Sequence, residues 1–423
     1  MHAFVKKIRL LAKKWMDYGI EGEYKIYRVK HTPVRFKMKY TSVYHKKYEK
    51  LPVQRDKIIF DNYKGGGFGC NCKYVLLKML EQGIQADYVW VLRNPEDAKM
   101  LPQGVRTVPY GSEQAMEEYA TAGVWVNNFQ MTYYLNRGLL KKPEQTYIQM
   151  WHGSFGIKKI EGSCDLLNSD KPWLVLAEKN AQITDYWISN SSFETQVYKE
   201  AFWGAGNILE YGHPRNDIFF GSEKQAESKV KETYGITDEK IVLYVPTFRD
   251  QDKSRVSQID ADRLTEALKE RFGGEWVFAL RQHPRMVNGE VSGFAMDANV
   301  CDVTGYPDIQ ELLAASDAVI TDYSSAIFDF MLTGRPAFLL AEDYEVYEDL
   351  RGLYYPLEDT PFPLARSQEE LRGKIKAFDE QQYRRDVEAF LEGKGSVEDG
   401  KAAERVAGLI KNLINDKKEV TNG

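Results

Sequence analysis

The chain has 423 residues, of which 43% are hydrophobic and 28% charged, a composition typical of globular proteins. This length is enough for two or three domains with sizeable cores. No stretch approaches roughly 18 uninterrupted apolar residues, so the sequence predicts no membrane-spanning helix. Lys13 and Lys14 interrupt the N-terminal apolar run, which argues against a secretory signal. Four cysteines are too few for a disulfide framework and indicate a reducing compartment.

The charge is distributed unevenly along the chain. Residues 1–57 hold 16 Lys and Arg against 5 Asp and Glu, a net charge of +11, whereas the remainder carries -16. A basic segment on an acidic body favours an anionic partner, either nucleic acid or a lipid surface. On a helix, Phe4, Ile8, Leu11 and Trp15 would share one side opposite several lysines. Such a helix either lies in a membrane interface or packs its apolar side on the protein body.

From Lys57 onward, short apolar runs alternate with helical patterns. The first series of strands is predicted at Lys57–Tyr63, Tyr88–Leu92, Val105–Val108, Val124–Asn127, Thr146–Trp151 and Tyr186–Asn190. The second is predicted at Ile241–Val245, Trp276–Leu280, Val300–Val303, Ala318–Thr321 and Pro336–Leu340. Helices are predicted at Lys73–Glu81, Glu113–Tyr119, Phe193–Phe202, Ser222–Thr233, Ala261–Arg271, Ile309–Ala315, Ala326–Leu332, Glu369–Phe378 and Ala402–Asn415.

This alternation predicts an α/β fold with parallel sheets and helices on both faces. Two series indicate two Rossmann-like domains facing each other across a cleft, preceded by the basic amphipathic segment. We expect a basic N-terminal segment over 1–57, a first Rossmann-like domain over 58–220, a second over 221–400, and a terminal helix within 401–423 that packs back. Ligands of such sheets bind beyond the carboxyl ends of the strands.

Three histidines follow or flank predicted strand ends: His152, His213 and His283. His152 is followed by Gly153, which lets a substrate approach the backbone, and this pattern suits a general base. The neighbouring Ser154 lacks the Gly-x-Ser-x-Gly spacing of a nucleophile elbow, which disfavours a serine hydrolase. Arg215 lies close to His213 in the sequence and has two possible roles. Its guanidinium either binds a phosphate or carboxylate of a ligand, or it forms an ion pair between the two domains.

The strand ends of the second series carry polar and cationic residues. Ser324 and Ser325 open a predicted helix, where free N–H groups bind phosphate, although Ser324 would also serve as a simple N-cap. Arg249, Arg281 and His283 would add positive charge for a pyrophosphate.

Asp308 and Glu311 lie on the preceding predicted helix and would accept hydrogen bonds from ribose hydroxyls. Residues 65–69 are predicted to form a flexible glycine-rich loop rather than a dinucleotide-binding site. The sequence also has no P-loop motif. Cys70 and Cys72 lack partner ligands for zinc, so we expect no metal site and at most weak assistance by a divalent cation.

Five motifs together resemble the CDP-glycerol glycerophosphotransferase family, whose members prime and polymerise teichoic acids and related phosphopolyol polymers. They are WHGS (Trp151–Ser154), GHPRND (Gly212–Asp217), LYVPTFRD (Leu243–Asp250), RQHP (Arg281–Pro284) and DIQELLAASDAVITDYSSAIFDF (Asp308–Phe330). The resemblance runs from about Ile58 to Tyr355. It implies a GT-B fold and peripheral attachment to the cytoplasmic face of the membrane, which fits the basic segment.

The resemblance also implies roles for individual residues. His152 matches the base that deprotonates the acceptor hydroxyl, and His283 matches a contact to the donor pyrophosphate. Donor-phosphate positions correspond to Arg281, Ser324 and Ser325, and nucleotide-pocket positions to Asp322 and Glu311. The other predicted substrate-binding residues are Gly153, Arg215, Thr247 and Arg249. The family commonly has Thr-Pro where this chain has Ser154-Phe155, and Asn or Ser in place of His213.

The sequence therefore predicts transfer of glycerol phosphate from CDP-glycerol to a membrane-linked saccharide or growing polyol-phosphate polymer, with release of CMP. The expected partners are CDP-glycerol, that acceptor and an anionic membrane surface rather than nucleic acid, and a homo-oligomer is compatible with the sequence. Three alternatives stay open: a CDP-ribitol-dependent transferase, a GT-B glycosyltransferase that uses a UDP- or GDP-sugar, and a non-enzymatic binding protein.

Overall fold

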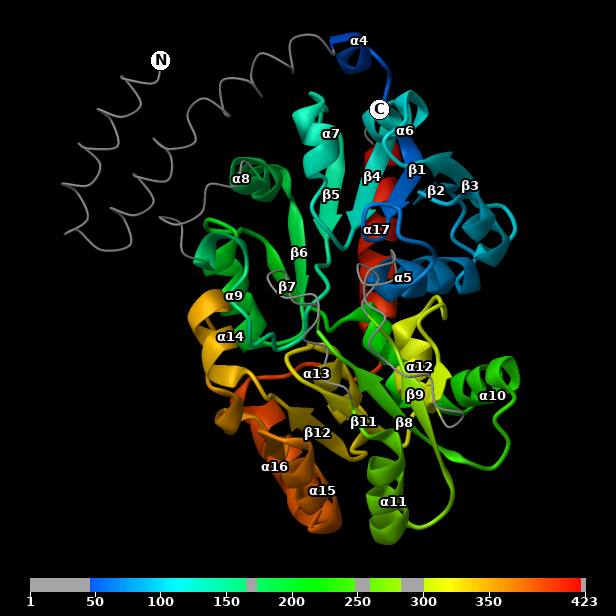
Figure 1. Cartoon of the computed structure of the whole chain (residues 1–423). Helices are drawn as coiled ribbons and strands as arrows, with labels where there is room; N and C mark the ends of the chain where they lie inside the picture. Colours follow the sequence, from blue (N-terminus) through cyan, green and yellow to red (C-terminus); the bar gives the residue numbers. More distant parts are fainter. Residues whose placement is uncertain (1–45, 165–172, 248–258, 283–299, 420–423) are drawn as a thin grey trace, which may run out of the picture.

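The computed structural model describes residues 46–164, 173–247, 259–282 and 300–419, and Figure 1 shows their arrangement. The basic helix predicted around Phe4–Trp15 lies outside these residues, as do two predicted site residues, Arg249 and His283. No helix in the described ranges combines the length and the apolar character that a membrane crossing requires.

The chain forms two separate parallel sheets. The first has the strand order β3-β2-β1-β4-β5-β6-β7. Its strands are β1 (Gln54–Asp61), β2 (Asp87–Leu92), β3 (Arg106–Pro109), β4 (Ala122–Asn127), β5 (Thr146–Gln149), β6 (Tyr186–Ser189) and β7 (Ile208–Glu210). Every pairing between these strands is parallel; Ile58 of β1, for example, is in register with Tyr88 and Val124 on either side.

The second sheet follows in sequence and has the order β10-β9-β8-β11-β12-β13, again with parallel pairings. Its strands are β8 (Lys240–Val245), β9 (Trp276–Leu280), β10 (Val300–Asp302), β11 (Ala318–Thr321), β12 (Ala337–Leu340) and β13 (Leu364–Ala365). All predicted strands are present within a few residues of their predicted bounds, so the predicted α/β fold with parallel sheets is confirmed.

Helices surround both sheets. They are α4 (Lys46–Glu49), α5 (Cys70–Glu81), α6 (Glu113–Thr121), α7 (Thr132–Asn136), α8 (Trp173–Ile183), α9 (Ser192–Ala201), α10 (Glu223–Tyr234), α11 (Ala261–Phe272), α12 (Ile309–Ala315), α13 (Ala326–Phe330), α14 (Tyr344–Arg351), α15 (Gln368–Lys376), α16 (Glu380–Gly393) and α17 (Ala402–Glu419). Short 3₁₀ segments are η2 (Pro95–Met100), η3 (Glu161–Ser163), η4 (Pro214–Phe220), η5 (Met331–Thr333) and η6 (Leu357–Asp359). Several helices begin at side chains that accept a hydrogen bond from the first turn, such as Ser191 for α9 and Asp308 for α12.

The first sheet is apolar on both faces because successive side chains of a strand point to opposite sides. Ile58 and Phe60 of β1 belong to a core with α5 and α17, which includes Val406 and Ile410. Ile59 between them belongs to the opposite core with α6, α7 and α8. The terminal helix α17 thus packs on the first sheet although it follows the second in sequence (Figure 1).

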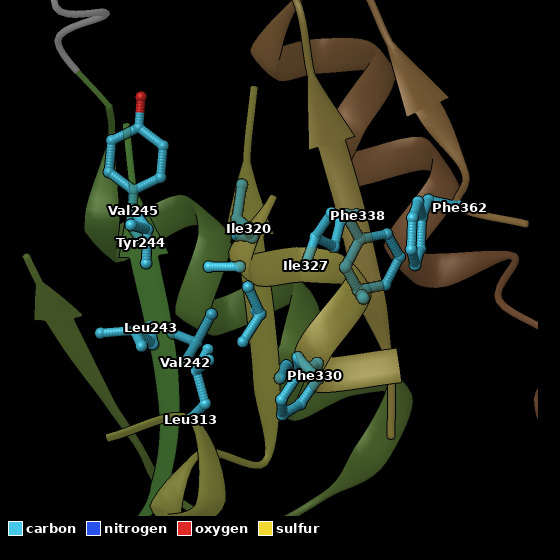
Figure 2. Packing of buried hydrophobic residues seen from close by; sticks show 14 of the residues in the cluster. Val242, Leu243, Tyr244, Val245, Leu313, Ile320, Ile327, Phe330, Phe338 and Phe362 are labelled. Carbon is cyan, nitrogen blue, oxygen red and sulfur yellow. The ribbon is translucent and has the colours of Figure 1, made fainter. Parts of the chain in front are cut away.

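The second sheet has its own core around β8, β11 and β12. In Figure 2, Val242 and Leu243 of β8 lie on one side of Ile320 and Ile327, and Phe338 of β12 lies on the other side, next to Phe362. This cluster also takes in Phe155, Ile157, Ile218 and Phe219 from the segments that precede β8. The two halves of the chain therefore share apolar contacts as well as backbone.

Candidate active site

His152 lies just beyond the carboxyl end of β5. Its Nδ1 is 2.9 Å from the backbone carbonyl oxygen of Asn128, which follows β4. A carbonyl oxygen only accepts, so Nδ1 carries the hydrogen and Nε2 of the neutral ring keeps its lone pair. Phe129 stacks on the imidazole with ring centroids 5.1 Å apart, and Trp151 lies 4.4 Å away. The ring is thereby fixed in orientation and in tautomer.

The surroundings also set the charge of His152. Burial lowers the pKa of its imidazole to about 4, and the positive charges of Arg215, His213 and Lys64 act in the same direction. The hydrogen bond to Asn128 opposes this shift without outweighing it. At neutral pH the side chain is therefore an uncharged imidazole whose Nε2 can accept a proton, which is the protonation state from which a general base acts.

Two residues after His152, Ser154 enters a buried polar network. Its Oγ is 2.9 Å from Nδ1 of His213, and it accepts hydrogen bonds from Arg215 at 3.1 Å and Asn190 at 3.3 Å. Nε2 of His213 lies 2.9 Å from a carboxylate oxygen of Glu194. The two histidines that the structure describes thus have different surroundings, because His213 is fully buried among polar partners while His152 is half-exposed.

Arg215 connects this network to the second sheet. Its guanidinium donates to both carboxylate oxygens of Asp329 on α13, at 2.9 and 3.2 Å, and its NH2 also reaches Ser154. Burial alone would raise the pKa of Asp329, but the Arg215 charge outweighs it and holds that pKa below its usual value. Of the two interpretations of Arg215, the ion pair is the one that the structure contains. A role in substrate binding stays a prediction.

Glu398, just before α17, joins the same network from the C-terminal side. It accepts hydrogen bonds from the side chains of Asn190 and Asn216 at 3.2 and 2.8 Å and from the backbone N–H of His213. Burial raises the pKa of Glu398 to about 7, although the positive charge of His213 and the two amides oppose the shift. This carboxyl group therefore titrates near neutral pH inside the network.

Three residues that are predicted to bind the donor substrate, Asp322, Ser324 and Ser325, follow strand β11 of the second sheet. Asp322 follows β11 and accepts from the N–H and the hydroxyl of Thr247, at 2.9 and 2.6 Å, so it ties the ends of β8 and β11 together. Ser324 accepts from the N–H of Ala326 at 3.3 Å, and Ser325 stands at the N-cap of α13 without a side-chain cap. The helix is shorter than predicted, because α13 passes into η5 at Met331.

Glu311 is engaged in two ion pairs. Its carboxylate is 2.6 Å from Nζ of Lys73 on α5 and 2.7 Å from Nζ of Lys229 on α10. Burial would raise the pKa of Glu311, but the two lysines lower it to about 2. Lys73 also pairs with Asp308 at 2.7 Å, which links the first sheet's α5 to α12. Contact of Glu311 with a nucleotide stays a prediction.

Arg281 follows β9, is half-buried, and donates through NH1 to the carbonyl oxygen of Tyr306 at 2.6 Å. Gly153 is half-buried beside Trp151. In the part of the chain that the structure describes, no three His, Cys, Asp or Glu side chains are grouped as metal ligands. The roles predicted for these residues, and for Arg249 and His283 outside the described ranges, stay predictions.

The sequence analysis does not predict several residues that surround the site. Asn128 orients His152, and Asn71 of α5 holds Arg215 by accepting from its backbone N–H at 3.1 Å. Asn190, Glu194 and Glu398 are part of the network around Ser154 and His213. The signal for Asn128 and Asn190 is in the sequence: both are polar residues placed directly after a buried strand.

Comparison with known proteins gives consistent matches. The family model for CDP-glycerol:poly(glycerophosphate) glycerophosphotransferase matches residues 43–412. The teichoic acid poly(glycerol phosphate) polymerase of Staphylococcus epidermidis is 31% identical, with 92% of this chain and 55% of that protein covered. The teichoic acid glycerol-phosphate transferase of Staphylococcus aureus is 30% identical, with 85% and 94% covered.

A solved structure of the wall teichoic acid polymerase TagF, a variant soaked with CDPG, is also similar. It superposes with a TM-score of 0.76 at 28% identity and covers 93% of this chain and 98% of the solved chain. The chain spans about half the length of the first curated relatives that it matches, 55% in each case.

Replacing Asp329 by Asn tests the buried ion pair. Asn keeps the shape but leaves the Arg215 charge without a carboxylate, so we expect stability to fall by about 3–5 kcal/mol. Chemical denaturation of wild type and variant measures the loss. Asp238→Asn, at an exposed position, is the matched control, and equal stabilities for the two variants would contradict the prediction.

Replacing Glu398 by Gln tests its raised pKa. The folded pKa of about 7 lies above the ordinary value of 4.5, so the folded state binds the proton more tightly. The contribution of this group to stability therefore decreases as pH rises from about 4.5 to 7. Glu398→Gln removes that dependence. We therefore expect the melting temperature of the variant, relative to that of wild type, to increase progressively as the pH rises over this range. The exposed Glu392→Gln is the control; a pH-independent difference for Glu398→Gln would refute the assignment.

Proposed function

Because the chain belongs to the CDP-glycerol:poly(glycerophosphate) glycerophosphotransferase family, we propose that it transfers glycerol phosphate from CDP-glycerol to an acceptor hydroxyl and releases CMP. The acceptor is a membrane-linked saccharide or a growing polyol-phosphate polymer of the teichoic acid or capsule type. The observation that carries the proposal is His152, a neutral imidazole whose Nδ1 is held by Asn128 and whose Nε2 keeps its lone pair.

In the proposed reaction, Nε2 of His152 takes the proton from the acceptor hydroxyl. The oxygen attacks the β-phosphorus, a new P–O bond forms to the acceptor, and the bond from that phosphorus to the oxygen of CMP breaks. Arg281 and the backbone N–H groups near Ser324 and Ser325 stabilise the charge that develops on the leaving CMP. Arg249 and His283 complete the donor side in this proposal, and Asp322, Thr247 and Glu311 border the nucleotide.

The proposal divides the chain as a GT-B protein. A first Rossmann-like domain over 58–220 receives the acceptor, a second over 221–400 binds CDP-glycerol across a cleft, and the C-terminal helix of 401–423 returns to the first. The two separate parallel sheets support this division. The basic segment 1–57, with its net charge of +11, attaches the protein peripherally to the anionic cytoplasmic face of the membrane.

The test is CMP release from CDP-glycerol with membranes or a lipid-linked acceptor, with CDP-ribitol and UDP-glucose in parallel. Release of CMP from CDP-glycerol alone supports the proposal. Release of CMP only from CDP-ribitol would change the donor, and release of UDP from UDP-glucose would replace the reaction class.

Replacing His152 by Ala removes the proposed base. A positioned base contributes roughly 10²–10⁴-fold, so turnover of CDP-glycerol is expected to fall by about that factor. The measurement is initial-rate CMP release at saturating donor. Thermal stabilisation by CDP-glycerol serves as the control, because donor binding does not need this imidazole. Unchanged turnover in a folded His152→Ala protein would remove His152 from the mechanism.

The pH profile gives a second prediction. Since the pKa of His152 is about 4 in the protein, the base stays unprotonated as pH falls from 8 to 5. We expect kcat/KM to show no acid limb from this group near 6.5, the usual histidine value. An acid limb near 6.5 that disappears in His152→Gln would contradict the lowered pKa.

A further inference from the structure

The loop after β1, residues 62–67, holds two adjacent side chains in a strained backbone conformation. Tyr63 and Lys64 have φ angles of 46° and 60°, the left-handed region that residues with a side chain seldom adopt. Such strain persists only where the surroundings impose it, and it is concentrated at functional positions. We refer to residues 62–67 as the β1 loop.

Three hydrogen bonds impose this conformation. The N–H of Tyr63 donates to Oδ1 of Asn128 at 2.8 Å, and the N–H of Gly65 donates to Oδ1 of Asp61 at 2.7 Å. The N–H of Gly66 donates to the carbonyl oxygen of Asn62 at 2.6 Å. The residue that fixes the His152 tautomer, Asn128, therefore also fixes the β1 loop, so the loop and the proposed base are positioned together.

The β1 loop places its side chains beside the base. The ring of Tyr63, which is 40% exposed, meets the imidazole of His152 edge-on at 5.2 Å. Nζ of Lys64 lies 4.4 Å from the ring centroid of Phe129, which stacks on the imidazole of His152. A cation and an exposed aromatic ring thus border the position from which an acceptor hydroxyl would reach Nε2.

Further cationic and aromatic side chains lie near the β1 loop, at the ends of the neighbouring strands. Arg93 follows β2, is exposed, and donates its backbone N–H to the carbonyl oxygen of Gly65 at 2.9 Å. Its guanidinium lies 4.7 Å from the ring of Tyr110, which is 5.3 Å from the ring of Tyr133. Arg137 also lies over Tyr133, but Glu113 pairs with it at 3.5 Å. The charges of Lys64 and Arg93 both act on the buried Asp61 at the end of β1 and lower its pKa against the effect of burial, so the two cations lie at the same strand ends.

We propose that Lys64 and Arg93, with Tyr63, bind a phosphate group of the acceptor next to the hydroxyl that His152 deprotonates. This inference rests on the proposed function and assigns Lys64, Arg93 and Tyr63 to a phosphate of its acceptor. Cations bind phosphate oxygens by charge-assisted hydrogen bonds, and the tyrosine rings cover the apolar edges of the polyol between phosphates. The phosphate is supplied either by a glycerol-phosphate chain or by the diphosphate of a lipid carrier.

The test compares Lys64→Gln, Arg93→Gln and the double variant on three soluble acceptors. These are a disaccharide alkyl glycoside, the same glycoside with one glycerol phosphate attached, and a short-chain disaccharide diphosphate lipid. Loss of a hydrogen bond to a charged group costs about tenfold in binding. We expect the KM of phosphate-bearing acceptors to rise about tenfold for each substitution, with the KM of CDP-glycerol unchanged. The acceptor on which the rise is seen identifies the source of the phosphate.

Lys64→Arg keeps the charge and should restore the KM, and Lys224→Gln, an exposed site on α10, removes the same charge elsewhere. Direct titration of wild type and variants with a glycerol-phosphate oligomer, without donor, separates the two proposals. No CMP release by wild type, with oligomer binding that depends on Lys64, would overturn the proposed function alone. Normal turnover with unchanged KM and oligomer binding in the double variant would overturn this inference, as would an equal loss on the neutral glycoside.

Discussion

The ion pair between Arg215 and Asp329 is the constraint on which the arrangement of the site depends. Both side chains are buried, so their desolvation is costly, and the pair is tolerable only with two good hydrogen bonds between them and further partners around them. Ser154 supplies one such partner to Arg215, and Gln310 donates to Asp329 at 3.2 Å. Such a pair adds little net stability, but only one relative placement satisfies it. It therefore fixes the loop of His152 against α13, from the first sheet to the second.

His152 and Glu311 show how burial and neighbouring charges together set the charge of an ionisable side chain. Among the described residues no carboxylate acts on His152, so desolvation prevails and the imidazole stays neutral. Glu311 meets desolvation as well, but Lys73 and Lys229 outweigh it and the carboxylate stays charged. A neutral imidazole and fixed charges thus coexist where the two sheets meet, because their partners differ. The polar contacts of Lys73 with Asp308 and Glu311 add a second set of ties between α5 and α12.

Much of the fold could be predicted from sequence because buried parallel strands are continuous apolar runs, as in Ile58–Phe60 and Val242–Val245. The edge strands β7 and β13 lack this signal because they are short and partly exposed. The position of His152 at a strand end was predictable from the apolar run before it. The ion-pair partner of Arg215 was not, because Asp329 is 114 positions away and only the packing of α13 brings it near. Likewise, the group that orients His152 is the backbone carbonyl of Asn128, so the position of this residue directly after β4 could indicate it but the side-chain type could not.

Glu194, His213 and Ser154 reproduce the order of a carboxylate–histidine–serine array, yet their environment gives it a different role. Ser154 is fully buried, its oxygen accepts from Arg215 and Asn190, and Nδ1 of His213 lies 2.9 Å from it. A hydroxyl in this state has no lone pair aimed at a substrate and no path for one to approach. The array instead continues the chain of polar contacts from α9 through Arg215 to Asp329. The failed nucleophile-elbow spacing and the buried geometry agree that these residues hold the His152 loop in place.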